Sequence, residues 1–296
     1  EFPGYGAVVS RELGGPMELP HNVAIPKNNQ GGTGYLGVKY AALATGKTPT
    51  PGMPFSVRGM TLDGSLTVSD VERRQMLLED LDQRFHAIED KNQLVEGLDR
   101  FTEQAHKIIT SPKAKEAFDT NRESSSFAAP FGETKFGQSC LLATRLVEHG
   151  VPYVQCNMGI VQSWDTHSDN FPRLKDKLLP GIDNGVSALM DDLEERSMLD
   201  DVLIVVVGEF GRTPNINKNP GRDHWASGYS GIFIGGGVRG GQVIGKSDKH
   251  AGHPETTPYH PNDIGATVYS TLGVDPATII RDRENRPLHL NNGKVM

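Results

Sequence analysis

Residues 202–207 read Val-Leu-Ile-Val-Val-Val, and this stretch decides the fold class of the chain. A short, unbroken apolar run that is rich in β-branched residues is typical of a parallel strand buried on both faces. From residue 134 onward, segments of helical and strand character alternate on either side of this run. We therefore predict an α/β fold in which helices cover both faces of a mostly parallel sheet.

Apolar spacing and helix-stopping residues place the other elements of this fold. Strands are predicted at 22–25, 151–156 and 230–234, and helices at 134–148, 174–196 and 262–272.

Composition divides the chain into three predicted parts. Residues 1–64 are rich in Gly and Pro and form the N-terminal part of the α/β domain. Residues 65–130 carry a charged helical hairpin at 69–119, expected as an insertion or cap, and a linker at 120–130. Residues 131–296 form the α/β core that carries the candidate site.

Overall composition narrows the function classes. The chain has 296 residues, a net charge of −7 and no long block of like charge, so we do not expect a nucleic-acid partner. The longest apolar runs are too short to span a bilayer, so we expect no membrane span. Cys140 and Cys156 are expected to be free thiols, with a disulfide as the alternative.

Three separated segments place carboxylates and imidazoles just after predicted strands. They contain Trp164-Asp165-Thr166-His167, Gly208-Glu209 and Asp223-His224. Ligands of parallel sheets bind outside the carboxyl ends of the strands, so we expect these segments to converge. Carboxylate and imidazole ligands suit zinc, manganese or calcium. The candidate ligands of a divalent metal are Asp165, His167, Glu209, Asp223 and His224.

Each candidate also has a structural interpretation, as a turn residue, a helix cap, an ion-pair partner or an ordinary loop residue. Glu209, for example, could pair with Arg212. The joint pattern favours a site, because a carboxylate directly after a buried strand is costly unless it is paired or ligated. Trp164 and Trp225 adjoin the candidate ligands and are expected to shield them from water.

Two further segments are weaker candidates. His250, His253 and His260 are expected in a solvated, Pro-rich loop, and a further metal ligand is the alternative. The glycine-rich run at 235–241 is expected to be a turn between strands, with a phosphate cradle as the alternative.

The most specific stretches of the chain are W-D-T-H-S-D-N-F at 164–171, G-E-F-G-R-T-P at 208–214 and G-R-D-H-W at 221–225. With them, the chain resembles the bacterial domain-of-unknown-function family numbered fifteen-oh-one, of the alkaline phosphatase and sulfatase superfamily. The resemblance implies a three-layer α/β sandwich with a helical insertion. It also implies a metal site that cleaves phosphate or sulfate esters.

Carried over by position, Asp165 and His167 resemble the first Asp/His ligand pair of that superfamily. Glu209 resembles the acidic half of the second pair, and His224 the last His ligand. The sequence departs from the pattern in its Asp-x-His spacing and in Phe210, which stands where a typical enzyme has a His. The superfamily's nucleophile and N-terminal Asp ligand are expected upstream of this chain. The chain would then correspond to the C-terminal two-thirds of a family member.

These features together predict a metal-dependent hydrolase in which Arg212 or Arg222 holds the anionic group of the substrate. The expected substrate is a small anionic ester or a sulfated or phosphorylated glycan. The resemblance implies export to the periplasm or the extracellular space. The alternative is a degenerate, non-catalytic member that binds a metal, a glycan or a protein.

Overall fold

The computed structural model describes residues 2–29, 31–57, 107–158, 163–282 and 284–296. The chain forms two compact units, residues 1–129 with 138–157, and residues 130–137 with 158–296. The fold is α/β and contains a three-stranded parallel sheet.

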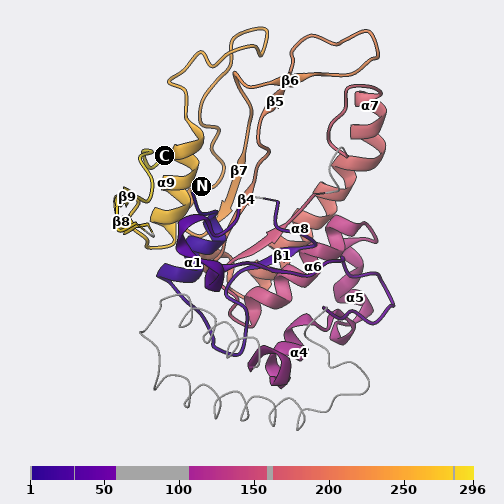
Figure 1. Cartoon of the computed structure of the whole chain (residues 1–296). Helices are drawn as coiled ribbons and strands as arrows, with labels where there is room; N and C mark the ends of the chain where they lie inside the picture. The colour runs from indigo at the N-terminus through magenta and orange to yellow at the C-terminus, as the bar shows by residue number, and fades with distance from the viewer. Residues whose placement is uncertain (1, 30, 58–106, 159–162, 283) are drawn as a thin grey trace. The chain divides into compact units, whose positions relative to one another are not determined.

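The parallel sheet belongs to the first unit and has the strand order β2-β1-β3. Its central strand β1 is labelled in Figure 1. Its strands are β1 (Val23–Ile25), β2 (Leu43–Ala44) and β3 (Val154–Cys156). The central strand β1 is buried at all three residues, and Val23 lies opposite both Leu43 and Val154. The strands predicted at 22–25 and 151–156 are therefore both present, with shorter bounds.

The helices of the first unit include α1 (Tyr5–Glu12), α4 (Pro112–Phe118), α5 (Ser125–Ala128) and most of α6 (Lys135–Glu148). Helix α4 begins where Ser111 Oγ accepts a hydrogen bond from the Ala114 amide at 3.2 Å, as expected of an N-cap followed by proline. The hydrophobic core joins β1 to α4 and α6 and contains Leu19, Val23, Ile25, Val57, Ile108, Ala114, Ala117, Phe118, Leu142, Leu146 and Val151.

The two cysteines lie in this unit and are free thiols, as expected. Cys140 on α6 is buried, and the Cys156 thiol donates a hydrogen bond to the Ser139 carbonyl at 3.4 Å.

Most of the helical hairpin predicted at 69–119 falls on residues 58–106, which lie outside the described part of the chain. Residues 107–110 are helical, and α4 follows them. The segment 120–130, expected as a linker, contains a 3₁₀ turn (Thr120–Arg122) and the short helix α5. The remaining 3₁₀ turns are Gly34–Leu36, Val38–Tyr40, Ala129–Phe131 and Leu199–Asp201.

In the second unit, the helix predicted at 174–196 begins four residues earlier. It consists of α7 (Asn170–Arg173), a π-helical turn (Leu174–Leu178) and α8 (Leu179–Glu195). Pro180 lies at the start of α8. Because proline has no N–H, it cannot donate to the carbonyl of the preceding turn, and we attribute the wider π turn to this missing bond.

The run at 202–207 forms β4 (Leu203–Val206), which pairs in antiparallel fashion with β7 (Ile232–Gly235). All four β4 residues are half-buried. The prediction of a parallel strand buried on both faces is therefore wrong for this segment. An apolar run identifies a strand but not the direction of its partner, and in the described part of the chain β4 pairs with β7 alone.

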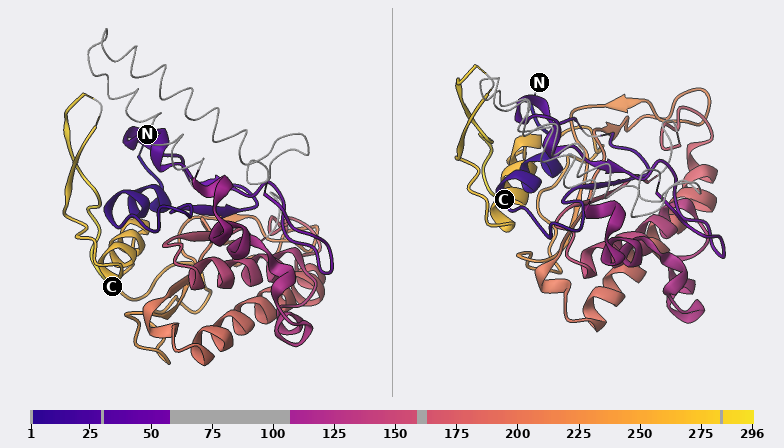
Figure 2. Two further views of the ribbon diagram at one scale, coloured as in Figure 1. Left: turned by 90° about the horizontal axis from the view of Figure 1, so that it is seen from below. Right: turned by 60° about the horizontal axis from the view of Figure 1, so that its bottom comes forward.

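Two further antiparallel pairs complete the second unit. Strands β5 (Gly211–Arg212) and β6 (His224–Trp225) form a two-residue ladder, and β8 (Ile279–Arg281) pairs with β9 (Pro287–His289). The chain end returns to α9 (Pro261–Thr271), as Figures 1 and 2 show, where the Met296 amide donates to Thr267 Oγ1 at 2.9 Å. No helix among the described residues is long and apolar enough to cross a membrane.

Candidate metal centre

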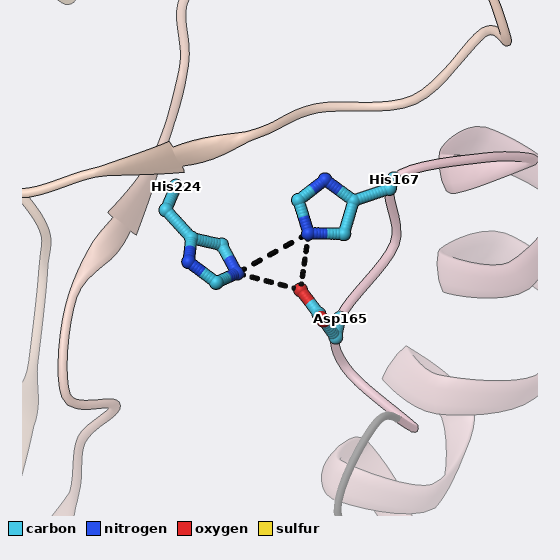
Figure 3. Close-up of side chains that lie close together, drawn as sticks. All are labelled: Asp165, His167 and His224. Carbon is cyan, nitrogen blue, oxygen red and sulfur yellow. Dashed lines mark hydrogen bonds and ion pairs between the residues drawn. The ribbon is translucent and has the colours of Figure 1, made fainter.

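Three predicted ligand residues meet at one point in the second unit. Asp165 Oδ1 lies 2.9 Å from His167 Nε2 and 2.8 Å from His224 Nε2, and the two imidazole nitrogens lie 3.3 Å apart. Asp165 and His167 come from the loop before α7, whereas His224 comes from β6 (Figure 3). We call these three residues the triad.

Thr166 explains why its two neighbours face the same way. Its side chain is buried, and its hydroxyl donates a hydrogen bond to Asn170 Oδ1 at the start of α7. With Thr166 turned into the protein, the residues before and after it project together toward His224 (Figure 3).

The loop at 217–222 holds the triad loop in place. Asn217 Nδ2 donates to the His167 carbonyl at 3.0 Å, and Asn217 Oδ1 accepts from the Gly221 amide at 3.0 Å. The Arg222 amide donates to the Thr166 carbonyl at 3.0 Å. Gly221 is required here, because a Cβ at this position would lie 2.0 Å from the His167 carbonyl oxygen.

Asp223 lies behind His167 and is not among the converging ligand atoms. Its Oδ1 is 2.7 Å from His167 Nδ1 and accepts from Asn217 Nδ2 at 3.1 Å. A carboxylate at Nδ1 holds the proton on that nitrogen and leaves the Nε2 lone pair directed at the triad. The structure thus places Asp223 as an orienting partner of a candidate ligand.

Glu209 is exposed and is not one of the triad residues. Its neighbour Phe210 packs on the triad instead, with its ring centroid 4.4 Å from that of His224. The phenyl ring of Phe210 therefore restricts the orientation of the His224 imidazole, whereas the hydrogen bond to Asp223 restricts that of His167.

Both candidate arginines donate to protein acceptors. Arg212 donates to Asp165 Oδ1 at 2.7 Å and to the Trp164 carbonyl at 3.0 Å. Arg222 donates to the carbonyls of Thr213 and Pro214 at 2.6 and 2.7 Å. In this arrangement Arg212 fixes a triad carboxylate, and Arg222 fixes the loop beside it.

These contacts favour the ionised carboxylates. The hydrogen bond from His224, followed by that from Arg212, lowers the pKa of Asp165 to about 2. The hydrogen bond from His167, followed by that from Asn217, lowers the pKa of Asp223. Both groups therefore carry negative charge at neutral pH, as a cation site requires.

The triad fits a divalent ion by distance and by donor chemistry. An ion at about 2.0–2.1 Å from three ligand atoms needs them roughly 3.3 Å apart or closer, and the triad separations of 2.8–3.3 Å meet that requirement. With the proton of His167 on Nδ1, its Nε2 lone pair faces the Asp165 carboxylate. Two such acceptors at 2.9 Å repel each other unless a proton or a cation lies between them.

A cavity of about 620 Å³ adjoins the triad and is lined by residues from 213–217, by Asp223 and Trp225, and by residues from 248–253. Both oxygens of Asp248 accept backbone amides of the last segment, from His250 and Gly252 at 2.9 Å and from His253 at 3.0 Å. His250 and His253 are exposed, as the predicted solvated loop requires.

The remaining predicted residues have structural contacts. His260 caps α9, where its ring accepts from the Asn262 amide at 3.5 Å. The two indole N–H groups donate to carbonyls, Trp164 to Met158 at 2.5 Å and Trp225 to Gly252 at 2.6 Å. Asn217 and Asp248 could not be predicted from the sequence, because an Asn or Asp in a polar loop has no local feature that separates it from an ordinary turn residue.

A family model with the description "Protein of unknown function (DUF1501)" matches residues 1–296, the whole of this chain. No curated protein and no solved structure matches the chain.

Proposed function

We propose that this chain, which belongs to the DUF1501 family of proteins of unknown function, is a metal-dependent hydrolase of phosphate or sulfate esters. One observation carries the proposal: Asp165 Oδ1, His167 Nε2 and His224 Nε2 lie within 4.8 Å of one another. The resemblance to the alkaline phosphatase and sulfatase superfamily supplies the reaction class and the three-layer sandwich to which this α/β fold would belong. Export from the cytoplasm is part of the same proposal.

The donor set favours zinc or manganese over calcium, because two of the three ligand atoms are imidazole nitrogens and calcium takes oxygen ligands. Three protein ligands leave a coordination position open, as in catalytic sites. The triad side chains are 32% to 51% exposed, so a substrate can reach them. The chemistry that a divalent ion supplies at such a site is Lewis-acid polarisation of an ester oxygen.

The residues around the triad prepare it for this task. Asp223 keeps a proton on His167 Nδ1, so that Nε2 is available as a ligand. Arg212 donates to Asp165 Oδ1 and is a cation beside the triad that could also hold an anionic ester.

A second candidate is a non-catalytic module that binds a metal, a glycan or a protein. Phe210 favours it, because the phenyl ring occupies a face of His224 where the superfamily resemblance leads us to expect a second imidazole ligand. Thr166 favours it too, since its buried hydroxyl is hydrogen-bonded to Asn170 and is not open to a substrate.

Metal titration and turnover together separate the two candidates. The chain is titrated with zinc, manganese and calcium by calorimetry, and hydrolysis of aryl phosphate and aryl sulfate esters is measured with each metal. His224→Ala is compared with His289→Ala, which removes an exposed imidazole outside both the triad and the adjoining cavity. One ion per chain and turnover that both disappear in His224→Ala alone support the hydrolase. Metal binding without turnover supports a metal-binding module, and the absence of metal binding contradicts the hydrolase.

A further inference from the structure

The lining of the cavity beside the triad differs in chemistry from the triad itself. It measures about 620 Å³, within the range of about 300–1,000 Å³ that is usual for small-molecule sites. Its lining includes Asn215, Asn217, Asp223, Trp225 and Asp248, and no Lys or Arg is among the described residues that line it. Two carboxylates without a fixed cation repel a phosphate or sulfate group, so the anionic end of an ester does not belong there.

We propose that this cavity binds an uncharged sugar ring, the alcohol portion of a phosphorylated or sulfated glycan whose anionic group reaches the triad. Only the statement that the anionic group reaches the triad rests on the proposed function. The cavity itself can bind a sugar whether or not the triad binds a metal.

Trp225 supplies the flat apolar surface on which a sugar ring packs. Its indole is fixed by the hydrogen bond to the Gly252 carbonyl at 2.6 Å and by edge contact with His253, whose ring centroid lies 5.6 Å away. A rigid aromatic side chain loses little entropy when it binds a ligand. The indole position is therefore set before the ligand arrives.

The polar lining matches hydroxyl groups better than an amine. Hydroxyls both donate and accept, and the side-chain amide of Asn215 also does both. A ligand ammonium needs acceptors only, and the carboxylates are already engaged: Asp248 accepts three backbone amides, and Asp223 Oδ1 accepts from His167 and Asn217.

Asp223 joins the cavity to the triad. It lines the cavity and at the same time contacts His167 Nδ1 at 2.7 Å. A ring in the cavity therefore lies beside the residue that orients a candidate metal ligand, so an ester group on that ring has a short path to the triad.

The two tryptophans of the chain make the test direct. In the Trp164→Phe variant, all indole emission comes from Trp225. This variant is titrated with the neutral disaccharides cellobiose and lactose, with glucosamine and with inorganic sulfate, all in the presence of EDTA. We expect a neutral disaccharide to change the Trp225 emission in a saturable way without any metal. Calorimetry on the otherwise unchanged chain should show affinity at least about tenfold weaker in Trp225→Ala, because the stacking surface is lost.

Asn215→Lys keeps the test valid if Trp225→Ala fails to fold. It fills the cavity from its rim and should abolish sugar binding, whereas Ser227→Lys, an exposed position outside the lining, should not. The proposal is overturned if no neutral disaccharide binds, if glucosamine binds more tightly than the neutral disaccharides, or if sulfate changes the Trp225 emission in EDTA. Sugar binding without metal binding would support the cavity and contradict the hydrolase, so the two failures are distinguishable.

Discussion

Asp223 and His167 are 56 residues apart in the chain, and the Asp223 carboxylate contacts the His167 Nδ1 at 2.7 Å. This contact fixes which imidazole nitrogen faces Asp165 and His224. The two neighbouring residues therefore have different roles: Asp223 orients the candidate ligand His167, and His224 is itself a candidate ligand.

The first prediction concerns this contact. Asp223→Asn should weaken zinc affinity about 10–100-fold, the usual cost of losing a carboxylate that orients a ligating histidine. The measurement is competition of the chain with a chromogenic chelator. Glu209→Gln is the matched control, because it neutralises an exposed carboxylate outside the triad. Equal losses in both variants would instead make Glu209 a ligand.

The second prediction concerns Thr166. Thr166→Val keeps the shape of the side chain but removes the hydroxyl that donates to buried Asn170, so it should lower the free energy of unfolding by about 1–3 kcal/mol. Urea denaturation measures this change. Ser168→Ala, at an exposed position two residues on, should have little effect. A Thr166→Val chain as stable as the parent would show that this hydrogen bond does not hold the loop.

The third prediction is a pH dependence. The pKa of Asp165 is lowered to about 2 by His224 and Arg212, so its ionised form stabilises the folded chain. That stabilisation is fully present above the unfolded pKa of about 3.9 and is lost as the pH falls through about 2. In metal-free chain, the stability difference between parent and Asp165→Asn should be present at pH 5 and should shrink below pH 4. A difference that stays constant to pH 2 would contradict the assignment.

The fourth prediction concerns Gly221. A Cβ there would lie 2.0 Å from the His167 carbonyl oxygen, so Gly221→Ala must push the two loops apart. We expect loss of metal binding and a lower melting temperature. Gly240→Ala is the control, because a Cβ at Gly240 meets no atom within 4 Å. The prediction fails if the two variants bind zinc equally well.

Local patterns predicted the elements whose signals are local. The strand β1 and the helices α6 and α9 follow from short apolar runs, from apolar spacing and from helix-stopping residues. The pairing of β4 with β7 could not be predicted in the same way, because an apolar run looks the same whether its partner is parallel or antiparallel.

The candidate site shows the same limit. Carboxylates and imidazoles after strands pointed to a meeting of Asp165, His167 and His224, which the structure brings together. Sequence could not separate these from Glu209 and Asp223. Which of two adjacent side chains faces a site depends on the backbone of the loop, and here it depends on the clamp that Asn217 forms between two loops.

The triad residues His167 and His224 are separated by 57 positions, and α7, α8, β4 and β5 all lie between them. An ion held by both would act as a removable cross-link that closes this long stretch into a ring. Closing a ring restricts the unfolded chain far more than the folded one. Unfolding of the second unit would then be tied to release of the ion, and a backbone cut between the two histidines would leave the pieces joined through it.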